Sequence, residues 1–507
     1  MLQKLFRGKK EKRAYNGSKL DGDMSKDNSE KIDSELTKTV NIFKTIYSYP
    51  DNQDVTIRNI HINGLNKDGA LLFISTITDT KVIDEYVIEP LLKNQDSEVK
   101  IDDLVSVPSI SKTTAIADIC TEVNNGSAVL FVDEETQAYI LNASNFESRG
   151  IEKPENETVV KGPKEAFIEK ASTNISLIRK RIKNENLVVE TQTVSKRSNN
   201  VAYIVYIKNV TNDDIVDKVK SRLHTMDVDA VQNLSLLEQY IEESHVSIFP
   251  TVLNTERPDR AVSFLEDGYV VLLMDNSPDS LVVPATFWSF YHTSEDHYLR
   301  LPYGNFTRVL RLFALFVTLF TSALYVAVVT FHVEMIPPDL LLAIASTREL
   351  VPFPALFEVL LMEIAFELIR EAGLRVPSPI GPTIGIVGAL ILGQAAVEAN
   401  IVSPIVVIVV ALGGLSSFAI GDISMNFAIR LSRFIFVIAA GVFGMYGMVA
   451  LFTLGVFYLV SIRTFGVPYL APMTPTYKSS KDTIFRKMLQ NEIFRPGYMK
   501  PKDMKKK

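Results

Sequence analysis

The sequence predicts an α+β soluble N-terminal region of two small α/β subdomains, followed by an α-helical membrane domain with several spans. Three observations predict this class. The front half is polar with short strand and helix patterns, the back half holds long runs without charge, and a basic tail follows the last run. A chain of 507 residues is long enough for two or three such domains.

The first subdomain is expected over residues 36–183. Val55–Ile62 alternates as a strand does, Gly69–Ile77 is a compact apolar strand, and Thr113–Val123 has helical spacing. Residues 1–35 are basic and polar and lack the apolar segment of a signal peptide, so we expect a disordered arm there.

The second subdomain is expected over residues 184–293. Two strands flank the polar turn Ser195–Asn200, two helices follow at Asp214–Met226 and Asn233–Ser244, and Arg260–Trp288 is expected to supply two or three strands. This order contains no repeating βαβ unit. It therefore favours an α+β fold over a doubly wound dinucleotide-binding fold.

The membrane domain is expected over residues 294–465. Its apolar runs are long enough to cross a bilayer, and we expect spans near 312–333, 383–399, 403–420 and 434–462. The segment 355–372 is different, because its charged residues share one helical face. It could lie at the interface, be re-entrant, or pack within an assembly.

The charge distribution orients these spans. From Arg463 to Lys507 there are 11 Lys or Arg against three Asp or Glu, which gives this segment a net charge of +8. Because the whole chain has a net charge of −6, the residues before Arg463 sum to −14. Because basic segments stay on the cytoplasmic side, we expect the N-terminal region and the tail, residues 466–507, to be cytoplasmic.

One polar group stands out in the apolar back half. Glu398 is the only ionisable residue between Thr383 and Ile420, and Gln394 and Asn400 lie close to it. A carboxylate at membrane depth costs about 2.5–3.5 kcal/mol on insertion scales. These residues could therefore line a watery pore, or they could form the polar end of a helical hairpin at the headgroup level.

Small residues recur on the same predicted helix at four-residue spacing. Such a stripe lets a second helix approach closely. Its members are Gly381, Gly385, Ala389 and Gly393.

Three stretches are similar to one family. Pro352–Ile420, Lys161–Ile182 and the Thr-Glu-Arg-Pro-Asp block within Phe249–Pro284 closely resemble the A subunit of bacterial spore germinant receptors, the GerA-type family. The likeness runs from about Asp118 to Pro472.

The resemblance implies a protein of the spore inner membrane that works with an integral B subunit and a lipoprotein C subunit. It also implies a homo-oligomeric ring, pentameric in this reading, that conducts monovalent cations when nutrients are sensed. Each Glu would then be repeated around the axis as an anionic collar. The candidate pore residues are Glu358, Glu363, Glu367, Gln394, Glu398 and Asn400, and the same family pattern covers Arg370 and Glu371.

A second group of matching residues is expected to have a structural or subunit-contact role. It consists of Glu256, Arg257, Pro258 and Asp259 in the Thr-Glu-Arg-Pro-Asp block, together with Arg179. The alternatives for the block are a fixed turn between strands and a solvated turn. Glu367 with Arg370 could instead form an ordinary ion pair within one helix.

Other function classes receive little support. The six His are scattered, Cys120 is the single cysteine, and no metal-ligand spacing or phosphate-binding Gly-rich loop is present, so we expect neither an enzyme nor a cofactor. Nucleic acid is not an expected partner, whereas membrane lipid is. A secondary transporter, a non-conducting scaffold and a paralogous subunit that amplifies ion release remain as alternatives.

Overall fold

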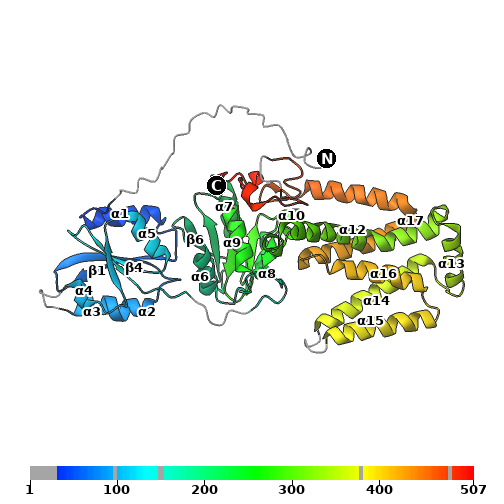
Figure 1. Ribbon diagram of the computed structural model, residues 1–507, viewed down its shortest axis with the longest axis horizontal. Helices are drawn as coiled ribbons and strands as arrows, with labels where there is room; N and C mark the ends of the chain where they lie inside the picture. Colours follow the sequence, from blue (N-terminus) through cyan, green and yellow to red (C-terminus); the bar gives the residue numbers. More distant parts are fainter. Residues whose placement is uncertain (1–30, 95–99, 147–152, 376–380, 478–481, 507) are drawn as a thin grey trace, which may run out of the picture.

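The computed structural model describes residues 31–94, 100–146, 153–375, 381–477 and 482–506. Two α/β units lie side by side at one end of an elongated molecule, and a helical region forms the other end (Figure 1). The predicted arm lies mostly outside the described residues. Of its last residues, Lys31 forms an isolated β-bridge with Ala115, and Ile32 is buried.

The first unit is a five-stranded antiparallel sheet in the order β1-β2-β4-β5-β3, with helices on both faces. Successive strand residues point to opposite faces, so Leu72 packs under α1 and α5, whereas Leu71 packs under the short helices of the other face. The elements are α1 (Leu36–Ile46), β1 (Val55–Ile62), β2 (Lys67–Ile74), α2 (Thr80–Ile83), η2 (Asp84–Ile88), α3 (Glu89–Lys93), α4 (Ile101–Leu104), β3 (Ile110–Thr113), α5 (Ile116–Asn124), β4 (Ala128–Val132) and β5 (Ala138–Leu141).

The second unit is also a five-stranded antiparallel sheet, in the order β6-β7-β9-β10-β8. The predicted α+β class of the N-terminal region is thus confirmed. The elements are α6 (Ala171–Arg181), β6 (Leu187–Thr193), β7 (Val201–Ile207), α7 (Asp213–His224), α8 (Leu234–Ile241), β8 (Leu253–Thr255), α9 (Pro258–Glu266), β9 (Val270–Met274) and β10 (Ser280–Val283).

The segment Arg260–Trp288 differs from its prediction. It supplies two strands, β9 and β10, but it begins in the helix α9. Pro258 starts this helix, where its missing N–H is no loss, and Ala261, Val262 and Leu265 are buried at helical spacing.

The two units are structural repeats of each other. Their sheets have the same strand order, and in each a helix ends at a glycine in the left-handed region, Gly126 (φ 92°) or Gly268 (φ 91°). The following hairpins also match, because Glu134 (φ 63°) and Asn276 (φ 64°) take the same unusual backbone conformation at the turn. No pattern identified in the sequence predicts this repeat.

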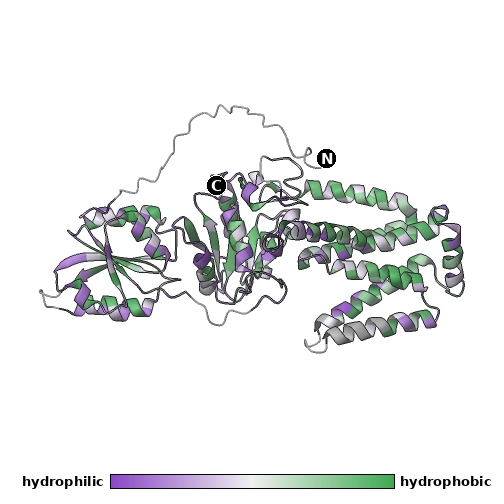
Figure 2. Cartoon of the chain, in the orientation of Figure 1, coloured by the Kyte–Doolittle hydropathy of each residue, from purple (hydrophilic) through white to green (hydrophobic). Residues whose placement is uncertain are grey.

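The helical region begins after β10. Its elements are α10 (Phe287–Tyr291), α11 (Glu295–Tyr298), α12 (Leu301–Phe331), η3 (Val333–Met335), α13 (Pro338–Arg348), α14 (Ala355–Arg375), α15 (Gly381–Glu398), α16 (Pro404–Ser417) and α17 (Ile423–Ser461). Its helices consist mostly of hydrophobic residues (Figure 2), and many of their large apolar side chains are exposed.

Within the described residues, two helices are long and apolar enough to cross a membrane, α12 and α17. α16 is apolar but has only 14 residues. The 39 residues of α17 would span about 58 Å if straight, more than the hydrocarbon thickness of about 30 Å. The helix is interrupted by a non-helical residue, Gly444 (φ 61°), and Met425 and Ile462 near its two ends both lie in the hydrophobic core of the second unit. The chain therefore reverses direction within α17.

The basic tail folds back onto the second unit. It contains the short strand β12 (Val467–Pro468), which pairs with β11 (Arg463–Thr464), and the turns η4 (Leu489–Asn491) and η5 (Gly497–Met499). The Tyr498 and Tyr269 hydroxyls lie 2.7 Å apart, and Arg486 is buried.

Candidate functional site

A chain of ion pairs lies between the long helices. The Glu363 carboxylate on α14 is fully buried and lies 2.6 Å from Arg433 Nη2 on α17. Ser322 on α12 donates a hydrogen bond of 2.6 Å to the other Glu363 oxygen. One carboxylate therefore joins three helices.

The next turn of α14 continues this chain. Glu367 accepts hydrogen bonds of 3.0 Å from both Arg430 Nε and Arg433 Nη2 of α17. Arg370 Nη2 donates to the Gly414 carbonyl (3.1 Å) and to Ser417 Oγ (2.7 Å) of α16. Both residues thus reach across to neighbouring helices.

Glu358 forms a second closed pair at the other end of α14. It is buried, lies 3.1 Å from Arg348 on α13, and accepts the backbone N–H of Ser403 at 3.0 Å. Separating these groups would leave a buried charge without compensation, which is unfavourable. The contacts of Glu358 therefore stabilise the packing of α14 against α13 and against the start of α16.

The polar residues of α15 are placed differently. Gln394 and Glu398 are exposed, and Gln394 Nε2 donates to Glu398 Oε1 at 2.9 Å. Asn400 is also exposed, with φ 53°, and lies in the turn before α16. Of the six candidate pore residues, Glu358 and Glu363 are thus buried and Glu367 is partly buried. The other three, Gln394, Glu398 and Asn400, are exposed.

The small-residue stripe is described only in part. Gly393 is buried against α16, since a Cβ at this position would lie 3.5 Å from Val407 Cγ1. For Gly381, Gly385 and Ala389 the structure describes the helical backbone alone.

The Thr-Glu-Arg-Pro-Asp block lies between a strand and a helix, β8 and α9. Arg257 is buried and donates to Asp259 Oδ2 (3.0 Å) and to the Pro163 carbonyl (2.9 Å). The Glu256 carboxylate accepts the N–H groups of Glu155 (2.9 Å) and Asn156 (3.2 Å). The block therefore fastens the segment that connects the two units onto the second unit.

Arg179 joins the two units themselves. Its guanidinium makes two bonds to the Asp54 carboxylate, of 2.6 and 2.7 Å, and both side chains are buried. A paired fork of this kind fixes orientation as well as distance.

Sequence reasoning missed a charged cluster at the junction of the second unit with α12. Arg308 is fully buried and contacts Asp296 (3.1 Å) and Asp482 of the tail, and Arg311 also pairs with Asp296. Burial opposes ionisation of Asp296, but its bonds to Arg311 and the nearby charge of Arg308 hold its pKa below the usual value. The sequence signal of this junction is the group of basic residues directly before the first apolar run, Arg300, Arg308 and Arg311.

Metal binding receives no support in the described part of the chain, where no group of three or more His, Cys, Asp or Glu could hold an ion. The geometry is that of a helical assembly fastened by buried ion pairs to a duplicated α/β region.

Comparison with known proteins defines the class. A sequence profile of the Bacillus/Clostridium GerA spore germination protein family matches residues 41–498, and the chain belongs to this family. It is 36% identical over 454 residues to spore germination protein KA of Bacillus subtilis (strain 168), covering 88% of this chain and 84% of that protein. It is 37% identical over 431 residues to spore germination protein B1 of the same organism, with 84% and 89% covered.

A solved structure is also similar. The crystal structure of the N-terminal domain of the A subunit of the Bacillus megaterium spore germinant receptor GerK3 matches with a TM-score of 0.41 and 24% identity. The match covers 51% of this chain and 98% of that domain.

Proposed function

We propose that this chain is the A subunit of a nutrient-responsive germinant receptor in the inner membrane of the spore. Its family supports a role in spore germination. In this proposal it assembles with itself, and with an integral B subunit and a lipoprotein C subunit, into a channel for monovalent cations. No catalytic step is part of the proposal.

The membrane placement is supported by α12 and α17, with α15 and α16 as a shorter hairpin between them. α15 has 18 residues, about 27 Å of helix, and α16 has 14, about 21 Å. Leu315 in the first half of α12 and Met425 and Ile462 near the two ends of α17 all lie in the core of the second unit, so the chain leaves this unit and returns to the same side. Both α/β units and the basic tail would then be cytoplasmic.

Self-association is supported by an unpartnered stripe on α14. Four large apolar side chains at helical spacing are exposed on this helix although its other face is packed. They are Phe357, Leu361, Ile364 and Leu368. In a membrane such a face contacts either lipid or a neighbouring copy, and the proposed pentamer uses it for the copy.

The exposed pair Gln394–Glu398 is the observation that best supports a channel. On the last two turns of α15, Ile391, Gln394, Ala395 and Glu398 form one exposed face. In a ring of copies, Glu398 would recur around the axis and favour cations over anions. Glu358 and Glu363 would instead hold the helices in place, because arginines already compensate their charges.

The test is conduction by the complete receptor. We would co-express the chain with its B and C partners in non-sporulating cells and follow the membrane potential as nutrients are added. Glu398→Gln should reduce the nutrient-dependent depolarisation about tenfold, because the collar loses its charge. Glu349→Gln, at an exposed carboxylate beyond α13, is the matched control and should conduct normally.

A non-conducting scaffold is the second candidate, because the acidic residues on the packed face of α14 are compensated by arginines. Absence of depolarisation in an assembled complex with an effective nutrient would favour this scaffold or an amplifying paralogue. Equal conduction by Glu398→Gln and the wild-type chain would show that this residue does not line the pore.

A further inference from the structure

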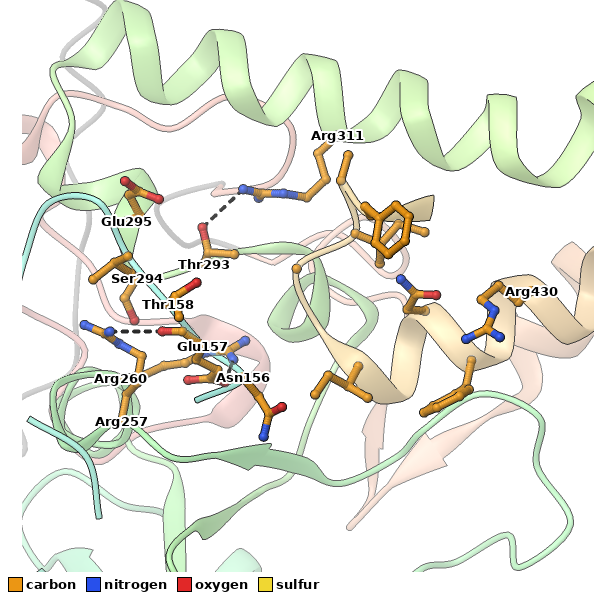
Figure 3. Close-up of a pocket in the computed structure, with 18 of the residues that line it drawn as sticks. Asn156, Glu157, Thr158, Arg257, Arg260, Thr293, Ser294, Glu295, Arg311 and Arg430 are labelled. Carbon is orange, nitrogen blue, oxygen red and sulfur yellow. Dashed lines mark hydrogen bonds and ion pairs between the residues drawn. The ribbon is translucent and has the colours of Figure 1, made fainter. Parts of the chain in front are cut away.

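A cavity of about 460 Å³ lies between the second unit and the helical region. Among the described residues, its lining includes five arginines and two carboxylates, Glu157 and Glu295. Two of the arginines come from the second unit, and one each from α12, α14 and α17; they are Arg257, Arg260, Arg311, Arg370 and Arg430. Figure 3 shows Arg257 and Arg260 at one side, Arg430 at the other, and Arg311 reaching in from α12.

The arginines differ in how their charges are compensated. Arg260 pairs with Glu157 at 2.5 Å, Arg311 with Asp296 at 3.1 Å, and Arg430 with Glu367. Arg257 pairs with Asp259 at 3.0 Å.

Arg370 is the exception. Its hydrogen-bond partners in the described part of the chain are the neutral Gly414 carbonyl and Ser417 hydroxyl, and no carboxylate there lies within 4.0 Å of it. A half-buried guanidinium whose direct partners are all neutral favours binding of an anion.

A second observation points into the same cavity. Arg257 is 1% exposed, and its buried Nε–H has no hydrogen-bond partner among the described residues. A buried donor left unpaired costs about 1–3 kcal/mol, so an acceptor supplied by a ligand would be stabilising. Thr158 and Ser294 add hydroxyl groups to the lining.

We propose that this cavity binds a phosphate group. A phosphate carries one to two negative charges on tetrahedrally arranged oxygens, which can accept bonds from guanidiniums that approach from several directions. A planar carboxylate suits a single guanidinium fork better. The arginines here come from four parts of the chain, so the tetrahedral anion fits the arrangement better.

The group would belong either to a soluble phosphate compound or to the headgroup of an anionic phospholipid. The lipid source rests on the proposed membrane placement, because Arg311 and Arg430 lie near the ends of α12 and α17 that enter the second unit. Either source supplies the same oxygens to the same arginines. The bound anion would bridge the second unit to α14 and hold the two in one arrangement.

The loop between α16 and α17 lies at this bridge. A Cβ at Gly421 would be 2.7 Å from Thr293 Cγ2, so this loop already touches the second unit closely. Ile420 beside it is buried in the hydrophobic core of that unit. An anion at the cavity would therefore act where the helices and the α/β region are mechanically joined.

The test uses the purified full-length chain. One arm measures thermal stabilisation in detergent by inorganic phosphate, and the other measures retention of phosphatidylglycerol against phosphatidylcholine by native mass spectrometry from mixed nanodiscs. Arg370→Gln should weaken binding of the responsive ligand about tenfold, as loss of a charge-assisted bond does. Arg300→Gln, at an exposed arginine outside the cavity lining, is the control and should bind as the wild type does.

A second pair of variants avoids damage to the arginine contacts. Thr158 is exposed at the cavity, so Thr158→Glu should weaken binding through repulsion, while Thr158→Gln of similar size should not. Glu295→Gln should strengthen binding, because it removes one of the two lining carboxylates.

A response to inorganic phosphate identifies a soluble source, and selective retention of phosphatidylglycerol identifies the headgroup; either supports the proposal. It is overturned if neither ligand binds, or if Arg370→Gln and Thr158→Glu bind as well as their controls. These measurements do not involve ion conduction, so their failure and a failure of the channel proposal remain distinguishable.

Discussion

The two α/β units have the same strand order but very different neighbours. The first unit touches the rest of the chain at the second unit, where Arg179 and Asp54 form a buried pair. The second unit shares its hydrophobic core with α12, with the α16–α17 loop and with the tail, through residues such as Leu315, Ile420 and Tyr469. It also buries charged residues where they meet these partners.

This difference shows that one fold can have two structural roles. The first unit is an end module that contacts the second unit, whereas the second unit, together with the start of α12, the α16–α17 loop and the tail that pack on it, forms what we call the joint. The joint contains Arg257, Arg260 and Arg308, all buried and hydrogen-bonded. The ion pairs of the first unit's own surface, such as Lys112 with Asp102, are more exposed. Perturbations at the joint should therefore have the larger effects.

The largest effect is expected at Arg308. Replacing it with Met leaves Asp482 without its arginine and Asp296 with Arg311 alone, and should destabilise the chain by about 3–5 kcal/mol. Thermal unfolding in detergent would show a lowered midpoint, with earlier hydrogen exchange in the tail. Lys112→Met in the first unit is the control and should change stability by less than about 1 kcal/mol. Equal losses of stability in the two variants would contradict the expected difference between the joint and the surface of the first unit.

Arg179→Met should come next, at about 3 kcal/mol, because Asp54 would remain buried and unpaired. The expected signature is local, since hydrogen exchange should rise at the contact between the units while the tail stays protected. Adding Asp54→Leu should recover part of the loss by removing the orphan carboxylate. Increased exchange in the tail would contradict the view that this contact is separate from the joint.

A pH effect of about 2 kcal/mol is expected from His292 in the second unit. Burial lowers its pKa to about 4 from 6.5, and its Nε2 lies 2.6 Å from the Thr483 carbonyl oxygen. Between these pH values the unfolded chain binds a proton that the folded chain does not, so stability should fall as the pH drops from 6.5 to 4.5.

His292→Gln should flatten this pH dependence of the thermal midpoint, whereas His61→Gln, at an exposed position in the first unit, should leave it unchanged. A change of midpoint between pH 6.5 and 4.5 that is the same in His292→Gln as in the wild type would contradict the assignment.

The smallest effects distinguish the two repeats at one matched position. Ala at Gly268 meets the strain of φ 91° but no atom closer than 3.5 Å, and should cost about 1 kcal/mol. Ala at Gly126 has the same φ, and its Cβ would also lie 2.6 Å from the Ile77 carbonyl oxygen, so about 2 kcal/mol or more is expected. Comparing the two thermal midpoints checks this, and a costlier Gly268→Ala would reverse the order.

Much of the fold could be predicted because its signals are local. Alternation identifies strands such as Val55–Ile62, and runs without charge identify the cores of α12 and α17. The start of α9 was missed because Val and Phe at short spacing suit a strand as well as a helix. The repeat was missed because the two copies share strand order and turn geometry more than residue identity.

The candidate site could be predicted only in its residue types. The acidic residues of α14 were identified, but their partners Arg430 and Arg433 lie more than 60 positions further along the chain, and no local pattern pairs them. Glu367 could equally have paired with Arg370 within its own helix. The tertiary arrangement decides which carboxylates are compensated and which remain exposed.

The duplication has an evolutionary consequence. A copy whose contacts lie with the neighbouring unit can change much of its remaining surface without disturbing the helices, while the copy that packs against the helices and the tail cannot. Sequence divergence among paralogous chains should therefore concentrate in the first unit. Related chains could then differ mainly in the first unit, with the second unit and the helices retained.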